Sequence, residues 1–531
     1  MTRSGRHAGE PRELELKLRV PPADLDRLAA SPVLAGRALG PARRRRLASV
    51  YFDTPDARLR ARGLALRVRR IGRRRIQTLK AEPRVGGLAA DRAEHEVTIE
   101  GDVPDLAAFR APGVRELVGL VLPGELVPMF ETRIERTALT IAWPAPERPE
   151  AEVEVALDHG RILAGNRREE VSELELELRR GPPGALVALA EELRSLAPLA
   201  VETRDKATRG WALAVDFVPP PRKSGRLALD PLGSVADALR RIGLACLGHW
   251  LANLAPATDG RDPEGLHQLR VALRRLRSAL SLFKGVVPEA DRARFNGELR
   301  WLLGELGPAR DCDVLAGELA VPLAAEEGLA SELEVLHRIL SARRPVLYER
   351  VRTALASRRA ADLVLDLGAW LELGRYRDRV APQVLEVLDG PVGPFAADSL
   401  ERRWRKARKL GRRLERLDPA GRHELRIAVK KLRYGLDFLA SLWPEAETRR
   451  FQVRLAELQD RLGHLNDVVV ARDQARGLLQ ELAGDPMAPT AALALGAVVG
   501  WHSRATRRLV TEAAECWAEL ADERRFWREA A

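Results

Sequence analysis

The spacing of apolar residues changes once along this 531-residue chain, and this change constrains the fold more than any other feature. Up to about Phe217, apolar and polar residues alternate in short runs separated by turns, which predicts β-strands. From about Ser234 the apolar residues recur every three or four positions, which predicts helices. The segment 218–226 between them contains three consecutive prolines and predicts a stiff linker. We therefore expect a β-rich domain over 1–217 and an all-α domain over 227–531.

Composition excludes several classes of protein. Hydrophobic residues make up 46% and charged residues 31%, as in ordinary folded proteins rather than disordered chains. The sequence contains neither a secretory leader nor an apolar run of about 18 residues, so we expect a cytoplasmic protein without a membrane partner. Three scattered cysteines argue against a disulfide framework or a structural zinc site. The net charge of +12 favours an anionic partner such as polyphosphate, nucleic acid or acidic lipid.

Charged residues share one face of several predicted strands. Glu13, Glu15 and Lys17 point the same way because successive side chains of a strand alternate. A single strand of this kind indicates only a solvated face, whereas several closed into a barrel would bring their charges together in its lumen. The strands that we expect in this half span 13–18, 64–70, 76–80, 94–100, 134–141, 152–157 and 173–178.

This charge pattern favours phosphate chemistry. Clustered carboxylates need neutralisation, which hard divalent cations supply, and facing Arg and Lys side chains could hold a phosphate chain bound to the same metal. The sequence has no G-x-x-x-x-G-K-[ST] pattern, which disfavours a P-loop ATPase. The basic runs Arg43–Arg46 and Arg73–Arg75 are interpreted as solvated surface.

The first half resembles the CYTH domain of the triphosphate tunnel metalloenzyme superfamily. The resemblance implies an eight-stranded antiparallel tunnel with flanking helices, which binds a triphosphate and one or two Mg²⁺ or Mn²⁺ ions. The motifs that carry it are Glu13–Lys17 (E-x-E-x-K), Tyr51–Asp56, Gly63–Arg69, Gln77–Lys80, Arg133–Arg136, Glu152–Gly160, Ser172–Glu177 and Lys206–Arg209.

The same resemblance implies roles for individual residues of the first half. The expected metal ligands are Glu13, Glu15, Asp158, Glu173 and Glu175. The expected phosphate-binding residues are Lys17, Arg67, Arg69, Lys80, Arg136 and Lys206. The expected catalytic residues are Glu13, Glu15, Lys17 and Glu175. Which carboxylates contact metal directly stays open, because several other acids point the same way, namely Glu94, Glu96, Glu152, Glu154 and Glu177.

The second half contains an internal repeat with an offset of 156 residues. The segment from His267 to Arg277 matches that from His423 to Arg433, and Leu306–Asp311 matches the corresponding segment 462–467. Within each copy, one histidine and three basic residues at spacings of three, four and three form a stripe along one helix face. Two such stripes facing each other would repel unless a polyanion lay between them, so the repeat predicts a ligand channel.

The repeated segments resemble the CHAD domain, the conserved histidine α-helical domain. The resemblance implies two pseudo-symmetric four-helix bundles and a basic channel that binds inorganic polyphosphate. The expected binding residues are His267, Arg270, Arg274, Arg277, His423, Arg426, Lys430 and Arg433. A further basic helix that could extend this surface carries Arg402, Arg405, Lys406 and Lys409. No matched carboxylates accompany the two histidines, so phosphate binding or hydrogen bonding is favoured over metal ligation.

Together the two halves suggest metal-dependent hydrolysis of inorganic triphosphate to diphosphate and phosphate, joined to polyphosphate binding by the helical domain. One alternative is a non-catalytic polyphosphate-binding or granule-associated protein. A thiamine triphosphatase or a class IV adenylate cyclase is the other. Aromatic residues are only 5% of the chain, which argues against binding of nucleic-acid single strands.

Overall fold

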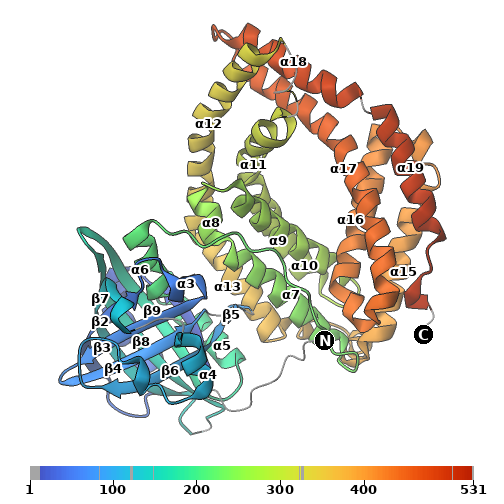
Figure 1. The fold of residues 1–531 in the computed structure, drawn as a ribbon. Coiled ribbons are helices and arrows are strands. Elements are labelled where there is room, and N and C mark those ends of the chain that lie inside the picture. The colour runs from blue at the N-terminus through green and yellow to red at the C-terminus, as the bar shows by residue number, and fades with distance from the viewer. Residues whose placement is uncertain are drawn as a thin grey trace. The chain divides into compact units, whose positions relative to one another are not determined.

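The computed structural model describes residues 12–528, apart from positions 83, 86, 120–122, 148, 322, 324–327 and 505. The chain forms two compact units, and Figure 1 shows strands in the first and helices in the second. The first unit holds the chain up to residue 220 together with 357–375, and the second holds 221–356 and 376–531. The sequence placed 357–375 in the helical domain, whereas in the structure this segment packs with the first unit.

The first unit is built on a closed, eight-stranded antiparallel barrel, as expected. Neighbouring strands follow the order β1-β9-β8-β7-β2-β3-β4-β6, and β6 pairs again with β1 to close the barrel. Short strands β10 (Ala200–Val201) and β5 (Arg84–Val85) extend the pairing at β1 and β6. The barrel strands are β1 (Arg12–Arg19), β2 (Arg43–Asp53), β3 (Leu64–Ile71), β4 (Arg74–Ala81), β6 (Ala90–Ile99), β7 (Val127–Trp143), β8 (Ala151–Ala164) and β9 (Arg167–Arg180).

Alternation along the strands separates an apolar outer face from a charged lumen. Leu16 on β1 pairs with Leu176 on β9, which pairs in turn with Val155 on β8, and all three side chains are fully buried. Helix α5 (Gly184–Arg194) packs over this face and buries Leu189 and other apolar residues. The other helices of this unit are α1 (Leu25–Ala29), α2 (Pro32–Ala35), α3 (Arg58–Ala61), α4 (Pro112–Val118), α6 (Lys206–Val215) and α13 (Arg358–Glu372).

Helix α13 packs on the first unit through specific contacts. Arg194 on α5 donates through Nη1 to Asp366 Oδ1 at 2.7 Å, and Arg375, just beyond α13, pairs with Glu191 of α5. Gly368 lies against Leu88 so closely that a Cβ at this position would clash with the leucine side chain. These contacts explain why this helix clusters with the barrel.

The second unit is all-α, as expected, and its helices follow the 156-residue repeat. Helices α9 and α16 begin 156 positions apart, as do α10 and α17. Asp262 and Asp418, which precede α9 and α16, accept hydrogen bonds from backbone N–H groups of the first turn, as N-cap residues do. The helices are α7 (Val235–Ala252), α8 (Leu254–Asp259), α9 (Pro263–Leu282), α10 (Glu289–Glu305), α11 (Gly307–Val314), α12 (Ala330–Ala356), α14 (Pro382–Asp389), α15 (Val392–Gly411), α16 (Pro419–Leu439), α17 (Glu445–Glu481), α18 (Ala488–Arg504) and α19 (Thr506–Asp522).

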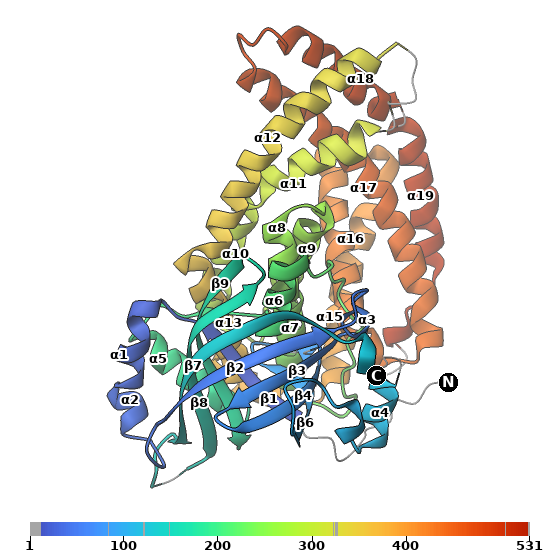
Figure 2. The ribbon, with the colours of Figure 1, turned by 60° about the vertical axis from the view of Figure 1, so that its left-hand side comes forward.

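The two copies differ where proline intervenes. The first copy breaks between α10 and α11 at Gly307-Pro308, because proline lacks the N–H that an uninterrupted helix needs. The second copy continues through the matching positions as the long helix α17 (Figure 2). One apolar core joins the copies, since Leu336 on α12 packs in the same cluster as Leu478 and Leu495 on α17 and α18. None of the helices that the structure describes is both long and apolar enough to cross a membrane.

Candidate active site and anion-binding helices

The barrel encloses a cavity of about 930 Å³ with charged walls. The register places the inward-facing residues of neighbouring strands side by side, so that Lys17 lies opposite Glu175 and Arg136 opposite Asp158. The residues predicted from sequence that border this cavity are Glu15, Lys17, Arg67, Arg69, Lys80, Arg136, Glu175 and Lys206. The side chain of Glu13 lies outside the described residues, although its backbone pairs with Arg92 of β6.

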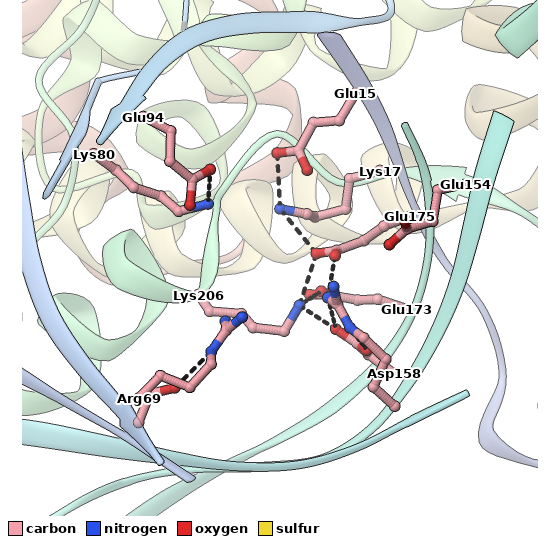
Figure 3. Close-up of polar contacts among 12 residues, drawn as sticks. Glu15, Lys17, Arg69, Lys80, Glu94, Glu154, Asp158, Glu173, Glu175 and Lys206 are labelled. Atoms are coloured by element: carbon pink, nitrogen blue, oxygen red, sulfur yellow. Dashed lines mark hydrogen bonds and ion pairs between the residues drawn. The ribbon is translucent and has the colours of Figure 1, made fainter. Parts of the chain in front are cut away.

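Lys206, in the first turn of α6, lies among three carboxylates (Figure 3). Its Nζ is 2.6 Å from Glu173 Oε2, 2.8 Å from Asp158 Oδ2 and 2.8 Å from Glu175 Oε1. Arg136 donates two hydrogen bonds of 2.7 Å to Asp158 and also pairs with Glu175. Asp158 and Glu173 are fully buried behind these cations, whereas Glu175 borders the cavity.

The surrounding cations favour the ionised forms of Asp158 and Glu175. Burial alone would raise the pKa of Glu175, but the charges of Lys206, Arg136 and Lys17 hold that pKa well below its usual value. The pKa of Asp158 is also lowered, because Lys206 and Arg136 outweigh the cost of burial. Conversely, the acids raise the pKa of Lys206 well above its usual value, although burial of the ammonium would lower it. Asp158, Glu175 and Lys206 are therefore charged at neutral pH.

The three carboxylates form the one group of possible metal ligands found among the described residues. Oxygen atoms of Asp158, Glu173 and Glu175 lie within 4.8 Å of one another. An all-carboxylate set suits hard metal cations such as Mg²⁺ or Mn²⁺. In this structure the ammonium of Lys206 lies between the carboxylate oxygens and supplies positive charge where a metal ion could also supply it. Glu15 is not a member of this group. It pairs with Lys17 at 3.4 Å and with Arg92 at 3.0 Å.

The phosphate-binding candidates differ in how far they are already paired. Lys80 Nζ lies 2.6 Å from Glu94, and Arg67 lies 3.3 Å from the same carboxylate. Arg69 donates only to the Ser49 hydroxyl, at 3.2 Å, and no carboxylate of the described chain lies within 4 Å of its guanidinium. Burial and the neighbouring charges of Arg67 and Arg136 lower the pKa of Arg69 to about 10. Arg69 is therefore the cation of this wall best placed to gain from a bound phosphate.

The sequence analysis did not assign to the site four basic residues that border the cavity, namely Arg43, Arg45, Arg92 and Arg179. Arg92 on β6 is buried and bridges Glu15 and Asp205, at 3.0 and 3.3 Å. Its position two residues before Glu94 on the same strand face was the available signal. Arg43 and Arg45 on β2 are exposed, which fits the interpretation of this basic run as solvated surface, and they also line the rim of the cavity.

In the second unit, the two predicted basic stripes lie on the neighbouring helices α9 and α16. Burial, together with repulsion by Arg426 and Arg274, lowers the pKa of Lys430 to about 8. The Nε atoms of Arg270, Arg274, Arg277 and Arg426 are all buried and without hydrogen-bond partners. No acidic group in the described part of this unit forms an ion pair within 4 Å of any stripe residue.

The two stripe histidines and the basic helix α15 differ in their contacts from the stripe arginines. His423 Nδ1 lies 3.3 Å from Asn466 Oδ1, and burial together with Arg310 lowers the pKa of His267. Neither histidine belongs to a group of three possible metal ligands among the residues described. On α15, Arg402 and Arg405 pair with acids of their own helix, whereas Lys406 faces Lys431 and contributes to lowering its pKa after the larger effect of burial.

Comparison with known proteins agrees with this division of the chain. The CYTH domain family matches residues 11–211 and the CHAD domain family matches residues 241–476. An inorganic triphosphatase of Haemophilus influenzae is 31% identical over 169 residues, which are 32% of this chain and 46% of that protein. The match thus spans less than half of the relative's length.

Two solved structures also resemble parts of the chain. The CHAD domain of the plant Ricinus communis shares 33% identity, covering 57% of this chain and 98% of that one, with a TM-score of 0.49. HpAC1 from Hippeastrum, a protein with a dominant triphosphatase activity, shares 19% identity over 38% of this chain and 95% of its own, with a TM-score of 0.30. From the two family matches, in the order expected from sequence, the chain is a protein that joins an N-terminal CYTH domain to a CHAD domain.

Proposed function

We propose that the barrel is a metal-dependent phosphoanhydride hydrolase that converts inorganic triphosphate to diphosphate and phosphate. The observation that carries this proposal is the arrangement of the lumen, where an acidic cluster adjoins a wall of cations that includes Arg69, which has no carboxylate partner among the described residues. The relationship to an inorganic triphosphatase supports the same reaction class.

The cations of the lumen bind and orient the substrate. Lys17, Arg69 and Arg136 lie where they can neutralise phosphate oxygens, and Arg67, Lys80 and Lys206 add to the same field. Guanidinium groups bind phosphate oxygens in pairs, which fixes the chain relative to the acids. As phosphate enters, Lys206 exchanges carboxylate oxygens for phosphate oxygens, because both are anions within reach of one flexible ammonium.

The carboxylates would hold Mg²⁺ or Mn²⁺, with Asp158, Glu173 and Glu175 as the candidate ligands and Glu13 and Glu15 as further ones expected from the resemblance. Such an ion supplies neutralisation of the transferring phosphoryl group and activation of water. Glu175 is the acid of the cluster that borders the cavity, and its lowered pKa keeps it able to accept a hydrogen bond from an attacking water. No residue needs to act as a covalent nucleophile.

For the helical unit we infer polyphosphate binding between α9 and α16. Buried guanidinium nitrogens without partners are costly, and like charges on neighbouring helices repel. A flexible chain of phosphates would accept hydrogen bonds from the buried guanidinium groups, because it carries many acceptor oxygens. It would also offset the repulsion between the helices, because each phosphate unit carries at least one negative charge.

The test of the barrel proposal is phosphate release from tripolyphosphate, ATP and thiamine triphosphate with Mg²⁺, Mn²⁺ or a chelator. We expect metal-dependent release that is greatest with tripolyphosphate and is abolished by Glu15→Gln. Glu135→Gln is the matched control, because Glu135 lies on the outer face and pairs with Arg44 and Arg46. No release from any substrate, with polyphosphate still bound, would show a non-catalytic binding protein instead.

A further inference from the structure

Arg209 is a buried cation of α6 that the proposed reaction does not use. It lies one turn after Lys206, so the two side chains share a face of the helix. Its Nη1 donates to Glu173 Oε1, its Nε donates to Glu169 Oε1 at 2.8 Å, and its Nη2 donates to the backbone oxygen of Glu170 at 2.6 Å. Of the described residues, Lys206 lines the cavity and Arg209 does not. Arg209 therefore acts on the site through Glu173.

Each of the three clustered carboxylates gives one oxygen to the ammonium of Lys206 and has its other oxygen bound by an arginine. The oxygens at 2.6–2.8 Å from Lys206 Nζ are Glu173 Oε2, Asp158 Oδ2 and Glu175 Oε1. The oxygens bound by arginine are Glu173 Oε1 on Arg209, and Asp158 Oδ1 and Glu175 Oε2 on Arg136. The six oxygens of the cluster are thus divided into two sets of three.

The two cations on Glu173 differ in their freedom to move. Lys206 has a flexible stem and borders the cavity, so its ammonium can leave Oε2 for a phosphate oxygen. The guanidinium of Arg209 is held by two further acceptors on β9, which keep it on Oε1. Glu173 therefore has one oxygen that it can give to a metal ion and one that stays occupied.

A carboxylate with one available oxygen suits some divalent cations better than others. Mg²⁺ requires octahedral geometry at short distances and keeps several waters, so single oxygens from separate carboxylates are enough to hold it. Mn²⁺ accepts the same octahedral arrangement of oxygens. Ca²⁺ takes about six to eight oxygens, and carboxylates often supply two each. A contact that occupies Oε1 of Glu173 thus disfavours the larger ion.

We propose that Arg209 is a positioning residue, which makes Glu173 a one-oxygen ligand and thereby selects Mg²⁺ or Mn²⁺ over Ca²⁺ in the barrel. This inference rests on the proposed metal-dependent function and deepens it by naming a residue that determines which cation the site accepts. Glu169 contributes indirectly, because it holds the same guanidinium in place. Without Arg209, Glu173 can turn both of its oxygens toward the ion.

The test measures metal binding by the full-length protein in the absence of phosphate. Electron paramagnetic resonance reports free Mn²⁺, while Mg²⁺ and Ca²⁺ are titrated as competitors. Arg209→Gln removes the positive charge, whereas Arg209→Lys keeps the charge but lacks the fork that binds three acceptors at once. Arg168→Gln, which alters an exposed arginine of β9, is the matched control. Circular dichroism shows whether each variant is folded, and Arg209→Lys decides alone if Arg209→Gln is not.

We expect Mg²⁺ to displace Mn²⁺ from the unaltered protein at a lower concentration than Ca²⁺ does. In the Arg209 variants the affinity for Ca²⁺ relative to that for Mg²⁺ should rise about tenfold, because one more charged oxygen becomes available. The control should keep the original ratio. An unchanged ratio in the folded variants, or an equal loss of affinity for both ions, would overturn the inference.

The proposed function is tested separately, because this measurement does not use hydrolysis. A protein that shows the change in selectivity but does not hydrolyse triphosphate would contradict the proposed function and support the role of Arg209. Failure of the unaltered protein to bind Mn²⁺ would overturn that role.

Discussion

The barrel and the paired helices both concentrate positive charge, but they balance it differently. In the barrel, Lys206 and Arg136 contact buried carboxylates at hydrogen-bond distances, and the acids raise the pKa of both cations. On α9 and α16 the cations face one another, so burial and mutual repulsion lower the pKa of Lys430 and Arg426.

This difference indicates what each site needs from its ligand. In the barrel, buried carboxylates balance Lys206 and Arg136 before a substrate arrives, which keeps these charges within the site and favours catalysis. On the helical face, no acidic partner in the described part of the unit balances the stripe cations, so a bound polyanion would stabilise the fold itself. Removing one cation should therefore have opposite effects on the stability of the two units.

The largest expected effect follows from removing the central cation of the barrel. Lys206→Met leaves three buried carboxylates without their shared partner and should destabilise the first unit by about 3–5 kcal/mol. Denaturant unfolding followed by near-ultraviolet circular dichroism measures this loss. Mg²⁺ should restore stability in the variant more than in the unaltered protein. Unchanged stability without metal would contradict the charge balance described for the barrel.

The second prediction uses a cation of the helical face. Arg274→Gln removes a repelling charge, so the second unit should unfold at a slightly higher temperature without ligand, while the affinity for polyphosphate falls about tenfold. Thermal unfolding and equilibrium binding give the two values. Arg507→Gln, which alters an exposed arginine of α19, is the control. Lower stability together with unchanged binding would indicate a structural role for Arg274.

The smallest effect concerns pH. The pKa of Lys430 is lowered to about 8 in the folded protein, so the folded state loses this proton at a lower pH than the unfolded state does. Stability of the helical unit should therefore rise as pH increases from about 8 to about 10, whereas polyphosphate binding should weaken by a few-fold over the same range.

Lys430→Arg tests the origin of this pH dependence. Arginine keeps its proton throughout this range, so the variant should bind polyphosphate with a flatter profile between pH 7 and 9. Binding titrations with polyphosphate at several pH values measure this profile. A profile identical to that of the unaltered protein would assign the pH dependence to another group.

The barrel carboxylates should respond to pH with the opposite sign. The pKa values of Asp158 and Glu175 are lowered on folding, so their contribution to stability is present above the unfolded values of about 4 and is lost as pH falls through the folded ones. Acid unfolding of the first unit should therefore be confined to pH below about 4.

Much of this architecture follows from sequence periodicity. Alternation predicted seven of the barrel strands, because each has one apolar face against the covering helices and one charged face toward the lumen. The repeat of basic residues likewise predicted the facing helices α9 and α16. Both patterns lie in residues that are close together along the chain, so the sequence alone is enough to recognise them.

Other features depend on contacts between distant segments. Strand β2 begins with four arginines, so its start shows no alternation in polarity, and only pairing with β7 reveals which of them face the lumen. The packing of α13 on the barrel depends on Asp366 and Gly368 meeting residues far away in sequence. The burial of Asp158 and Glu173 behind Lys206 also depends on the register of β7, β8 and β9 and on the position of α6.

The measurement that tests the central claim most directly is a pair of assays on Glu175→Gln. This change removes one charge from the acidic cluster and leaves the helical face untouched. The account predicts loss of tripolyphosphate hydrolysis by at least about a thousandfold, with an unchanged dissociation constant for polyphosphate. Retained hydrolysis, or a parallel loss of polyphosphate binding, would contradict the assignment of reaction to the barrel and of binding to the helices.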